Sequence, residues 1–242
     1  MNKNIPYIST DQMREVDRAM IEDFNIELVQ MMENAGRNLA QLARQRFLND
    51  DPRGKTITVL VGTGGNGGGG LVGARHLHNW GAKIKPILTK APNQYRGVPA
   101  HQLQILEKMG CPATTVEQGP DFTSAGDLII DAIIGYSPTG TPTGPAAQLI
   151  TWANQQDIPI LSLDVPSGID ATAGPIYDHA IRATATMTLS LPKKGLRPKN
   201  ALPFVGELYL ADIGVPPSLY SRPPLNIDIQ APFAKKEILR IA

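Results

Sequence analysis

Apolar positions along the chain follow two spacings, and their alternation predicts a sheet with helices on both faces. Mostly apolar runs predict strands at 57–61, 84–88, 114–116, 127–134, 159–165, 185–190 and 207–210. Between several of these runs, apolar residues recur every third or fourth position, which predicts helices up to Trp80, over 98–109 and over 146–154. Strands that alternate with helices are typical of a Rossmann-like α/β fold with a doubly wound, mostly parallel sheet. No linker or repeat interrupts the pattern, so we expect a single domain over residues 1–242.

The chain before the first predicted strand is helical in pattern as well. Ser9 and Gln12 have the spacing of a capping box, and apolar residues then recur at helical spacing from Met13 to Met20. A second helical pattern runs from about Met31 into the forties. Because both helices precede every strand, we expect them to pack outside the sheet or to form a subunit contact.

Composition excludes several classes of protein. The net charge is only +1, which gives no electrostatic reason to expect a nucleic-acid or membrane-surface partner. No apolar run approaches the ~20 residues of a membrane span, and the N-terminus has no apolar signal core. The single cysteine, Cys111, fits a reducing compartment, so we expect a cytoplasmic protein.

The most distinctive segment, called here the glycine stretch, is residues 62–70, of which seven are glycine. We expect a loop that presents backbone N–H groups to an anionic ligand, because glycine reaches positive φ and allows close approach. A flexible linker fits less well, since core-like sequence lies on both sides. Residues 62–67 match G-x-G-x-x-G, but no acid follows about 20 positions later and no G-K-[ST] is present. Neither the dinucleotide fingerprint nor the P-loop is therefore complete.

Two carboxylates follow buried apolar runs. Asp131 and Asp164 should both lie near the edge of the sheet where parallel strands end, close to the glycine stretch. Each either caps a loop through backbone N–H groups or has a partner, a cation or a raised pKa. Asp170 is expected to stabilise its own turn. Asn66, Asp131 and Ser167 bring oxygen atoms only, which suits an alkali or alkaline-earth cation.

Several ordered motifs resemble the YjeF N-terminal domain family, the NAD(P)H-hydrate epimerases, over about residues 8–217. They are M-x-x-x-D at 13–17, M-E-x-A-G at 32–36, the glycine stretch, D-A-I-I-G at 131–135, D-V-P-S-G at 164–168, L-P-K-K-G-L at 191–196 and A-D-I-G-V-P at 211–216. The resemblance implies a Rossmann-like fold, often a homodimer, and epimerisation of the R and S forms of hydrated NADH or NADPH (NADHX, NADPHX) at nicotinamide C6. Some relatives carry a fused dehydratase domain, which we expect to be absent because the chain ends at residue 242.

By matching positions, the resemblance also implies a site. A potassium ion would be held by Asn66, Asp131 and Ser167. The substrate would contact two segments and one carboxylate: Gly65, Asn66, Gly67, Gly68 and Gly69; Gly135, Tyr136, Ser137, Pro138, Thr139, Gly140 and Thr141; and Asp164. Inverting a carbinolamine carbon means losing and regaining its hydroxyl or opening the ring. Either route needs a proton shuttle, which a buried carboxylate with a raised pKa can provide, and Asp164 is the predicted catalytic residue.

The glycine stretch departs from the family pattern G-P-G-N-N-G-G-D-G at three positions. Thr63, Gly65 and Gly69 stand where the family has Pro, Asn and Asp. Gly69 removes a carboxylate that would line the site. Two interpretations remain open: an active epimerase, and an altered or inactive module that retains a nucleotide pocket without turnover.

Overall fold

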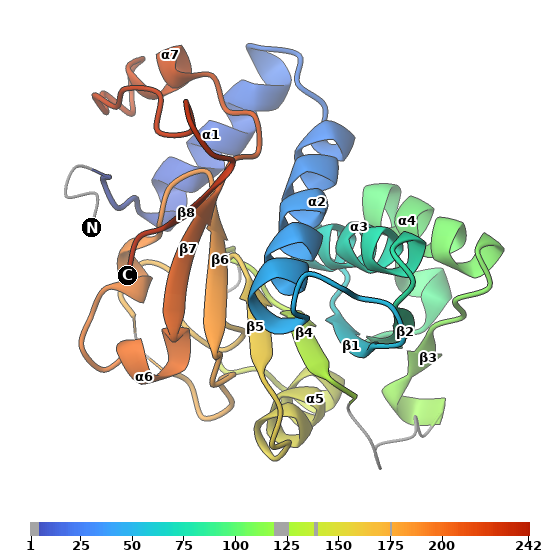
Figure 1. Ribbon diagram of the computed structural model, residues 1–242. Helices are drawn as coiled ribbons and strands as arrows, with labels where there is room; N and C mark the ends of the chain where they lie inside the picture. The colour runs from blue at the N-terminus through green and yellow to red at the C-terminus, as the bar shows by residue number, and fades with distance from the viewer. Residues whose placement is uncertain (1–4, 119–125, 138–139, 175) are drawn as a thin grey trace.

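The apolar runs form the strands of one central sheet in the computed structural model, which describes residues 5–118, 126–137, 140–174 and 176–242 (Figure 1). The strand order among the described residues is β3-β2-β1-β4-β5-β6-β7-β8. The strands are β1 Thr56–Val61, β2 Lys83–Leu88, β3 Thr114–Thr115, β4 Leu128–Ala132, β5 Ile160–Leu163, β6 Ala185–Leu189, β7 Glu207–Ala211 and β8 Ile238–Arg240. β1 to β7 pair in parallel, and β8 pairs antiparallel with β7. The predicted mostly parallel sheet is confirmed.

Helices cover both faces of this sheet. The helices are α1 Thr10–Glu22, α2 Leu28–Phe47, α3 Gly65–Asn79, α4 Gly97–Lys108, α5 Gly144–Asn154, α6 Leu202–Val205 and α7 Pro217–Tyr220, with short 3-10 turns η1 Pro92–Gln94, η2 Val116–Gln118 and η3 Lys194–Leu196. Val59 and Val61 of β1 pack in one apolar cluster with residues of α2, α3 and α4. Leu60, between them, packs in a second cluster with α5 on the other face. No described helix is long and apolar enough to cross a membrane.

The two N-terminal helices pack outside the sheet, which was one of the two arrangements expected; the other was a subunit contact. The capping box of α1 is confirmed, because the Ser9 hydroxyl accepts from the Gln12 N–H at 3.2 Å and the Gln12 side chain accepts from the Ser9 N–H at 2.9 Å. α2 packs against α3 (Figure 1). α1 lies against α7 in a separate apolar cluster that includes Met13 and Ile213. This position places α1 beside the strand-end loops.

The glycine stretch is mainly helical, so the predicted loop is wrong. α3 begins at Gly65, and no glycine between residues 62 and 70 has a positive φ. These glycines instead permit close packing. A Cβ on Gly67 would lie 1.8 Å from the Gly62 carbonyl oxygen, and one on Gly70 would lie 2.4 Å from the Ala132 Cβ. The absence of side chains lets the first turns of α3 press onto the ends of the strands.

We expect Gly67→Ala to lower the melting temperature by about 2–8 °C, since overpacking at the upper end of its usual range of about 1–3 kcal/mol exceeds the gain in helix propensity by about 1–2 kcal/mol. The clash involves backbone atoms, which cannot rotate away. Gly64→Ala is the matched control, because nothing lies within 4 Å of a Cβ at that position. Thermal unfolding followed by circular dichroism checks the pair, and equal melting temperatures for the two variants would contradict this account.

Candidate functional site

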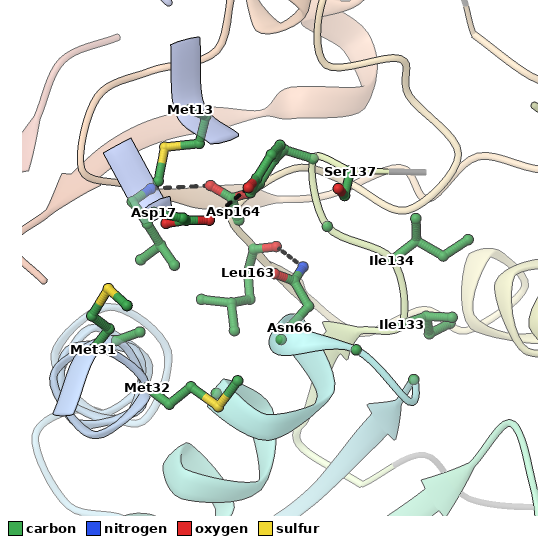
Figure 2. A pocket seen from close by; sticks show the side chains of 18 of the residues that line it. Met13, Asp17, Met31, Met32, Asn66, Ile133, Ile134, Ser137, Leu163 and Asp164 are labelled. Carbon is green, nitrogen blue, oxygen red and sulfur yellow. Dashed lines mark hydrogen bonds between the residues drawn. The ribbon is translucent and has the colours of Figure 1, made fainter. Parts of the chain in front are cut away.

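A cavity of about 440 Å³ lies at the carboxyl ends of the strands, beside the point where the strand order reverses between β1 and β4. This is the place where open α/β sheets bind ligands. Its wall is formed by the turn after β1 and the start of α3, the loop after β4, the ends of β5 and β6, and side chains from α1 and α2. Figure 2 shows the side chains from these separate elements pointing into one space.

One wall of the cavity is apolar. Leu28, Met31, Met32 and Ala35 of α2 line it. In Figure 2, Met31 and Met32 lie away from the labelled carboxylates of Asp17 and Asp164. An unbranched, polarisable methionine surface suits a flat ring system.

Asp164 lies just past β5, within the polar part of the cavity wall. Its φ is +67°, a left-handed conformation that costs a non-glycine residue about 1–3 kcal/mol and that recurs at functional sites. Asp164 is 2% exposed, and its carboxylate forms an ion pair with the Lys193 ammonium group. The Leu189 N–H donates to the same carboxylate oxygen at 3.2 Å. Lys193 is fully buried and also donates to the Leu189 carbonyl at 2.8 Å, so both charges of the pair have partners.

Asp17, from α1, lies at the same end of the cavity (Figure 2). The Tyr136 hydroxyl donates to its carboxylate at 2.6 Å. Burial raises the pKa of Asp17, and the negative charge of Asp164 acts in the same direction. The hydrogen bond from Tyr136 and the positive charge of Lys193 oppose that rise in the pKa of Asp17. Burial and the nearby Asp17 charge also raise the pKa of Tyr136.

Asp131 lies behind the cavity wall and joins two strand-end loops. Its buried carboxylate accepts from the Ser162 hydroxyl at 2.8 Å, and from the Ser167 N–H and hydroxyl at 2.9 and 2.6 Å. The Ile133 N–H completes the set at 3.3 Å. Burial raises the pKa of Asp131, and the bonds from Ser167 and Ser162 oppose the rise. Asp131 therefore caps the strand-end loops through the N–H groups of Ile133 and Ser167, and it also has two hydroxyl partners.

The three proposed cation ligands lie around the same strand ends. Asn66 donates to the Leu163 carbonyl at 2.7 Å. Its side-chain oxygen lies 2.7 Å from where a Cβ of Gly135 would be. The Ser167 hydroxyl accepts from the N–H of the residue before Gly135, at 2.9 Å. Amide, hydroxyl and carboxylate oxygens in one region fit an alkali cation, with the Asp131 carboxylate as its counter-charge.

The start of α3 supplies a second binding element. The N–H groups of Gly65, Asn66 and Gly67 occupy the first turn of a helix, where backbone donors have no partner within the helix. Gly64, Gly65 and Asn66 line the cavity. The helix dipole adds partial positive charge at this point, so this end of the helix favours negative charge in the cavity. The N–H groups that were expected in a loop therefore belong to the first turn of α3.

The structure brings part of the predicted substrate set to the cavity. The residues that line it are Gly65, Asn66, Gly69, Gly135, Tyr136, Ser137 and Asp164. Four members lie elsewhere: Gly67 and Gly68 are buried in helix packing, and Gly140 and Thr141 are exposed outside the lining. Pro138 and Thr139 lie outside the described residues.

Asp170 stabilises its own turn, as predicted. Its carboxylate accepts from the N–H groups of Thr172 and Ala173 at 2.8 Å each. These bonds lower the pKa of Asp170 against a desolvation effect that raises it. Asp170 is not among the residues that line the cavity.

Two titratable residues of the cavity wall were not predicted to be functional: Asp17 and Lys193. A signal for Asp17 was present, since Met13, Asp17 and Met20 stand at i, i+4 and i+7 and share one helix face. An acid on an apolar face points to a buried partner. Lys193 follows a predicted strand, but the sequence does not indicate that its side chain turns inward to Asp164.

The chain is similar to known proteins over most of its length. The family described as "YjeF-related protein N-terminus" matches residues 28–195. An NAD(P)H-hydrate epimerase of Dehalogenimonas lykanthroporepellens is 41% identical over 97% of this chain and 92% of its own. A bifunctional NAD(P)H-hydrate repair enzyme of Salinibacter ruber is 32% identical over 90% of this chain, which spans only 42% of that longer protein. The crystal structure of the yeast protein ynu0 superposes with a TM-score of 0.83 at 25% identity, covering 98% of this chain and 100% of its own.

Proposed function

We propose that this chain, which belongs to the family of YjeF-related N-terminal domains, is an NAD(P)H-hydrate epimerase that interconverts the R and S forms of NADHX and NADPHX. The observation that carries the proposal is the cavity itself. It combines two elements. The first is the anion-binding N-terminus of α3 at Gly65 and Asn66, which follows β1. The second is the buried carboxylate of Asp164, which follows β5, two strands away in the sheet. A dinucleotide offers a pyrophosphate for the first element and a reactive ring for the second.

The two elements give the substrate an orientation. The pyrophosphate binds at the N-terminus of α3, where unpaired N–H groups and the helix dipole favour negative charge. The hydrated nicotinamide ring lies toward Asp164, with Leu163 and the α2 methionines in the surrounding wall. Closing apolar side chains around the ring excludes water from the reacting carbon.

Inversion at C6 requires a proton to leave and return. Asp164 is the base, because its carboxylate reaches the cavity and its backbone is held in a left-handed conformation by the surrounding structure. Lys193 positions this carboxylate through the buried ion pair. Both routes, loss of the hydroxyl and ring opening, use such a group.

The departures in the glycine stretch define the second candidate, a nucleotide-binding module without turnover. A Cβ on Gly65 would lie 3.6 Å from the Met32 methyl group, so a side chain has room there. A Cβ on Gly69 would lie 2.9 Å from a Leu163 methyl group, so an acid at that position requires Leu163 to move. The glycines therefore leave the cavity wider and less polar beside Leu163.

One assay separates the two candidates. One isomer of acid-generated NADHX is purified and incubated with the protein, and the approach to the equilibrium mixture is followed by chromatography. We expect equilibration well above the rate of a heat-denatured control. If the protein binds NADHX saturably but equilibrates the isomers no faster than that control, the chain is a nucleotide-binding module and not an epimerase.

We further propose a potassium ion at Asn66, Asp131 and Ser167, supported by their oxygen-only donors at neighbouring strand ends. An ion bound to the folded state stabilises it by about 2.7 kcal/mol at a concentration of 100 times its Kd. The melting temperature is therefore expected to rise more in potassium chloride than in tetramethylammonium chloride of equal ionic strength. Identical melting in the two salts would exclude a specific ion.

We also propose a homodimer, which the family resemblance implies, and a cytoplasmic location, which the single cysteine indicates. Ile21, Leu28 and Val29, at the corner between α1 and α2, are 40%, 40% and 39% exposed and supply apolar surface for a subunit contact. Light scattering of the purified protein measures the oligomeric state directly. The single buried cysteine, Cys111, fits a reducing compartment.

A further inference from the structure

We propose that Asp17 is a second catalytic residue, which protonates the ring nitrogen N1 while Asp164 takes the proton of the C6 hydroxyl, so that epimerisation proceeds by ring opening. This inference rests on the proposed epimerase function. It assigns a role to the acid of the M-x-x-x-D motif at 13–17, which the family resemblance had not placed in the site.

The titratable side chains of the cavity are gathered at one end. Among the described lining residues they are Asp17, Tyr136, Asp164 and Lys193. These four side chains contact one another in sequence. Tyr136 donates to Asp17, and Lys193 pairs with Asp164. The Lys193 ammonium group lies 5.8 Å from the Tyr136 ring centroid and so connects the two pairs. Figure 2 shows Asp17 and Asp164 at this end, with Met31 and Met32 farther along the wall.

The two carboxyl groups have opposite environments. Asp164 receives an ammonium group and a backbone N–H, partners that stabilise a carboxylate and so suit a base. Asp17 has a raised pKa, chiefly from burial, which favours the protonated form that an acid needs. When one of two neighbouring carboxyl groups is held as a carboxylate and the other is favoured in its protonated form, the two commonly act as base and acid of one reaction.

The one-sided arrangement favours ring opening over loss of the hydroxyl. In the carbinolamine, the hydroxyl oxygen and N1 are both bonded to C6, so an acid and a base on one side can serve both atoms. Loss of hydroxyl with inversion needs water activated on the opposite face of the ring. Among the described residues, the other polar side chains that line the cavity belong to Thr63, Asn66, Thr89 and Ser137, and none of them is an acid or base that could activate such a water.

The step balances without any further reactant. Asp164 removes the hydroxyl proton, and the O–H electron pair forms the carbonyl π bond of an aldehyde. The N1–C6 bonding pair moves to N1, which takes the proton of Asp17. Rotation about the C5–C6 bond presents the other face of the aldehyde. N1 then attacks C6 and returns its proton to Asp17, and the oxygen regains a proton from Asp164.

The direct test is Asp17→Asn. We expect kcat to fall by about 10²–10⁴-fold with KM changed much less, because a positioned acid is lost while the pyrophosphate site at α3 is untouched. Asp11→Asn is the matched control, since the Asp11 side chain lies on the same helix, 88% exposed, and should retain the parental rate. An Asp17→Asn protein with the parental kcat overturns the proposal.

Tyr136→Phe is expected to change the pH dependence of kcat in a way that a purely structural role of Asp17 would not. The titratable groups that face Asp17 are Tyr136, Asp164, Lys193 and Tyr220. The Tyr136 hydrogen bond lowers the pKa of Asp17, so its removal raises that pKa further. Because the acid must be protonated, activity falls as pH rises through this pKa. We expect the alkaline limb of the kcat profile to move to higher pH in Tyr136→Phe, and an unmoved limb counts against the proposal even where Asp17→Asn does not fold.

Oxygen-18 water distinguishes the route. Ring opening keeps the original oxygen on C6, so each inversion should introduce well under one labelled atom. One labelled atom per inversion would overturn ring opening in favour of hydroxyl loss. A parent protein that does not equilibrate NADHX at all would instead refute the proposed function, which the isomer assay detects before any variant is made.

Discussion

Asp164→Asn is expected to lower kcat for NADHX epimerisation by about 10²–10⁴-fold, the usual consequence of removing a general base. Asparagine is nearly the same shape and is among the residues that tolerate a left-handed backbone, so the φ of +67° at this position can be kept. What is lost is the group that accepts the proton. Binding of NAD-like ligands should change much less, since the phosphate contacts lie at Gly65 and Asn66.

The substitution also leaves Lys193 without its counter-charge, so a lower melting temperature is expected beside the loss of rate. The kinetic measurement is therefore made at a temperature where circular dichroism shows the variant to be folded. Asp170→Asn is the matched control, because Asp170 follows the same strand, stays outside the cavity and bonds to its own turn. Turnover by Asp164→Asn at the rate of this control would end the case for Asp164 as the base.

Much of the fold could be predicted because its elements have strong periodic patterns. Ile129 and Ile130 face opposite apolar clusters, so both had to be apolar and the run was readable as a buried strand. The Ser9 capping box was readable because its two hydrogen bonds join residues three positions apart. The edge strand β8 was missed because its three residues, Ile238–Arg240, are too few to show a period.

The site was only partly predictable, because its decisive contacts join residues far apart in sequence. Asp131 and Asp164 were found from the apolar runs before them. The partner of Asp17 is Tyr136, 119 positions away, and no local spacing connects the two. The glycine stretch was misinterpreted for a related reason. These positions are glycine because Met32, Ala132 and Leu163 of other elements pack closely against α3 and leave no room for a Cβ. A local turn that needs positive φ is not the reason.

The largest effect on stability is expected from Lys193→Met. The ammonium group of Lys193 is fully buried against Asp164, which is 2% exposed. Removing one member of a buried ion pair typically costs about 3–5 kcal/mol, because the other charge remains buried without compensation. In a protein of this size that corresponds to a fall in melting temperature of roughly 6–20 °C. Lys194→Met is the control, since Lys194 is exposed and its loss should change stability by no more than about 0.5 kcal/mol.

The double variant Asp164→Asn/Lys193→Met separates the charge effect from packing. With both charges removed, no uncompensated ion remains, so the double variant should unfold at a higher temperature than Lys193→Met alone. Its epimerase activity should stay as low as that of Asp164→Asn, because the base is still absent. Thermal unfolding and the isomer assay on the four proteins of the cycle measure both quantities. A double variant no more stable than Lys193→Met would show that the lysine contributes through its packed side chain and not through the charge it shares with Asp164.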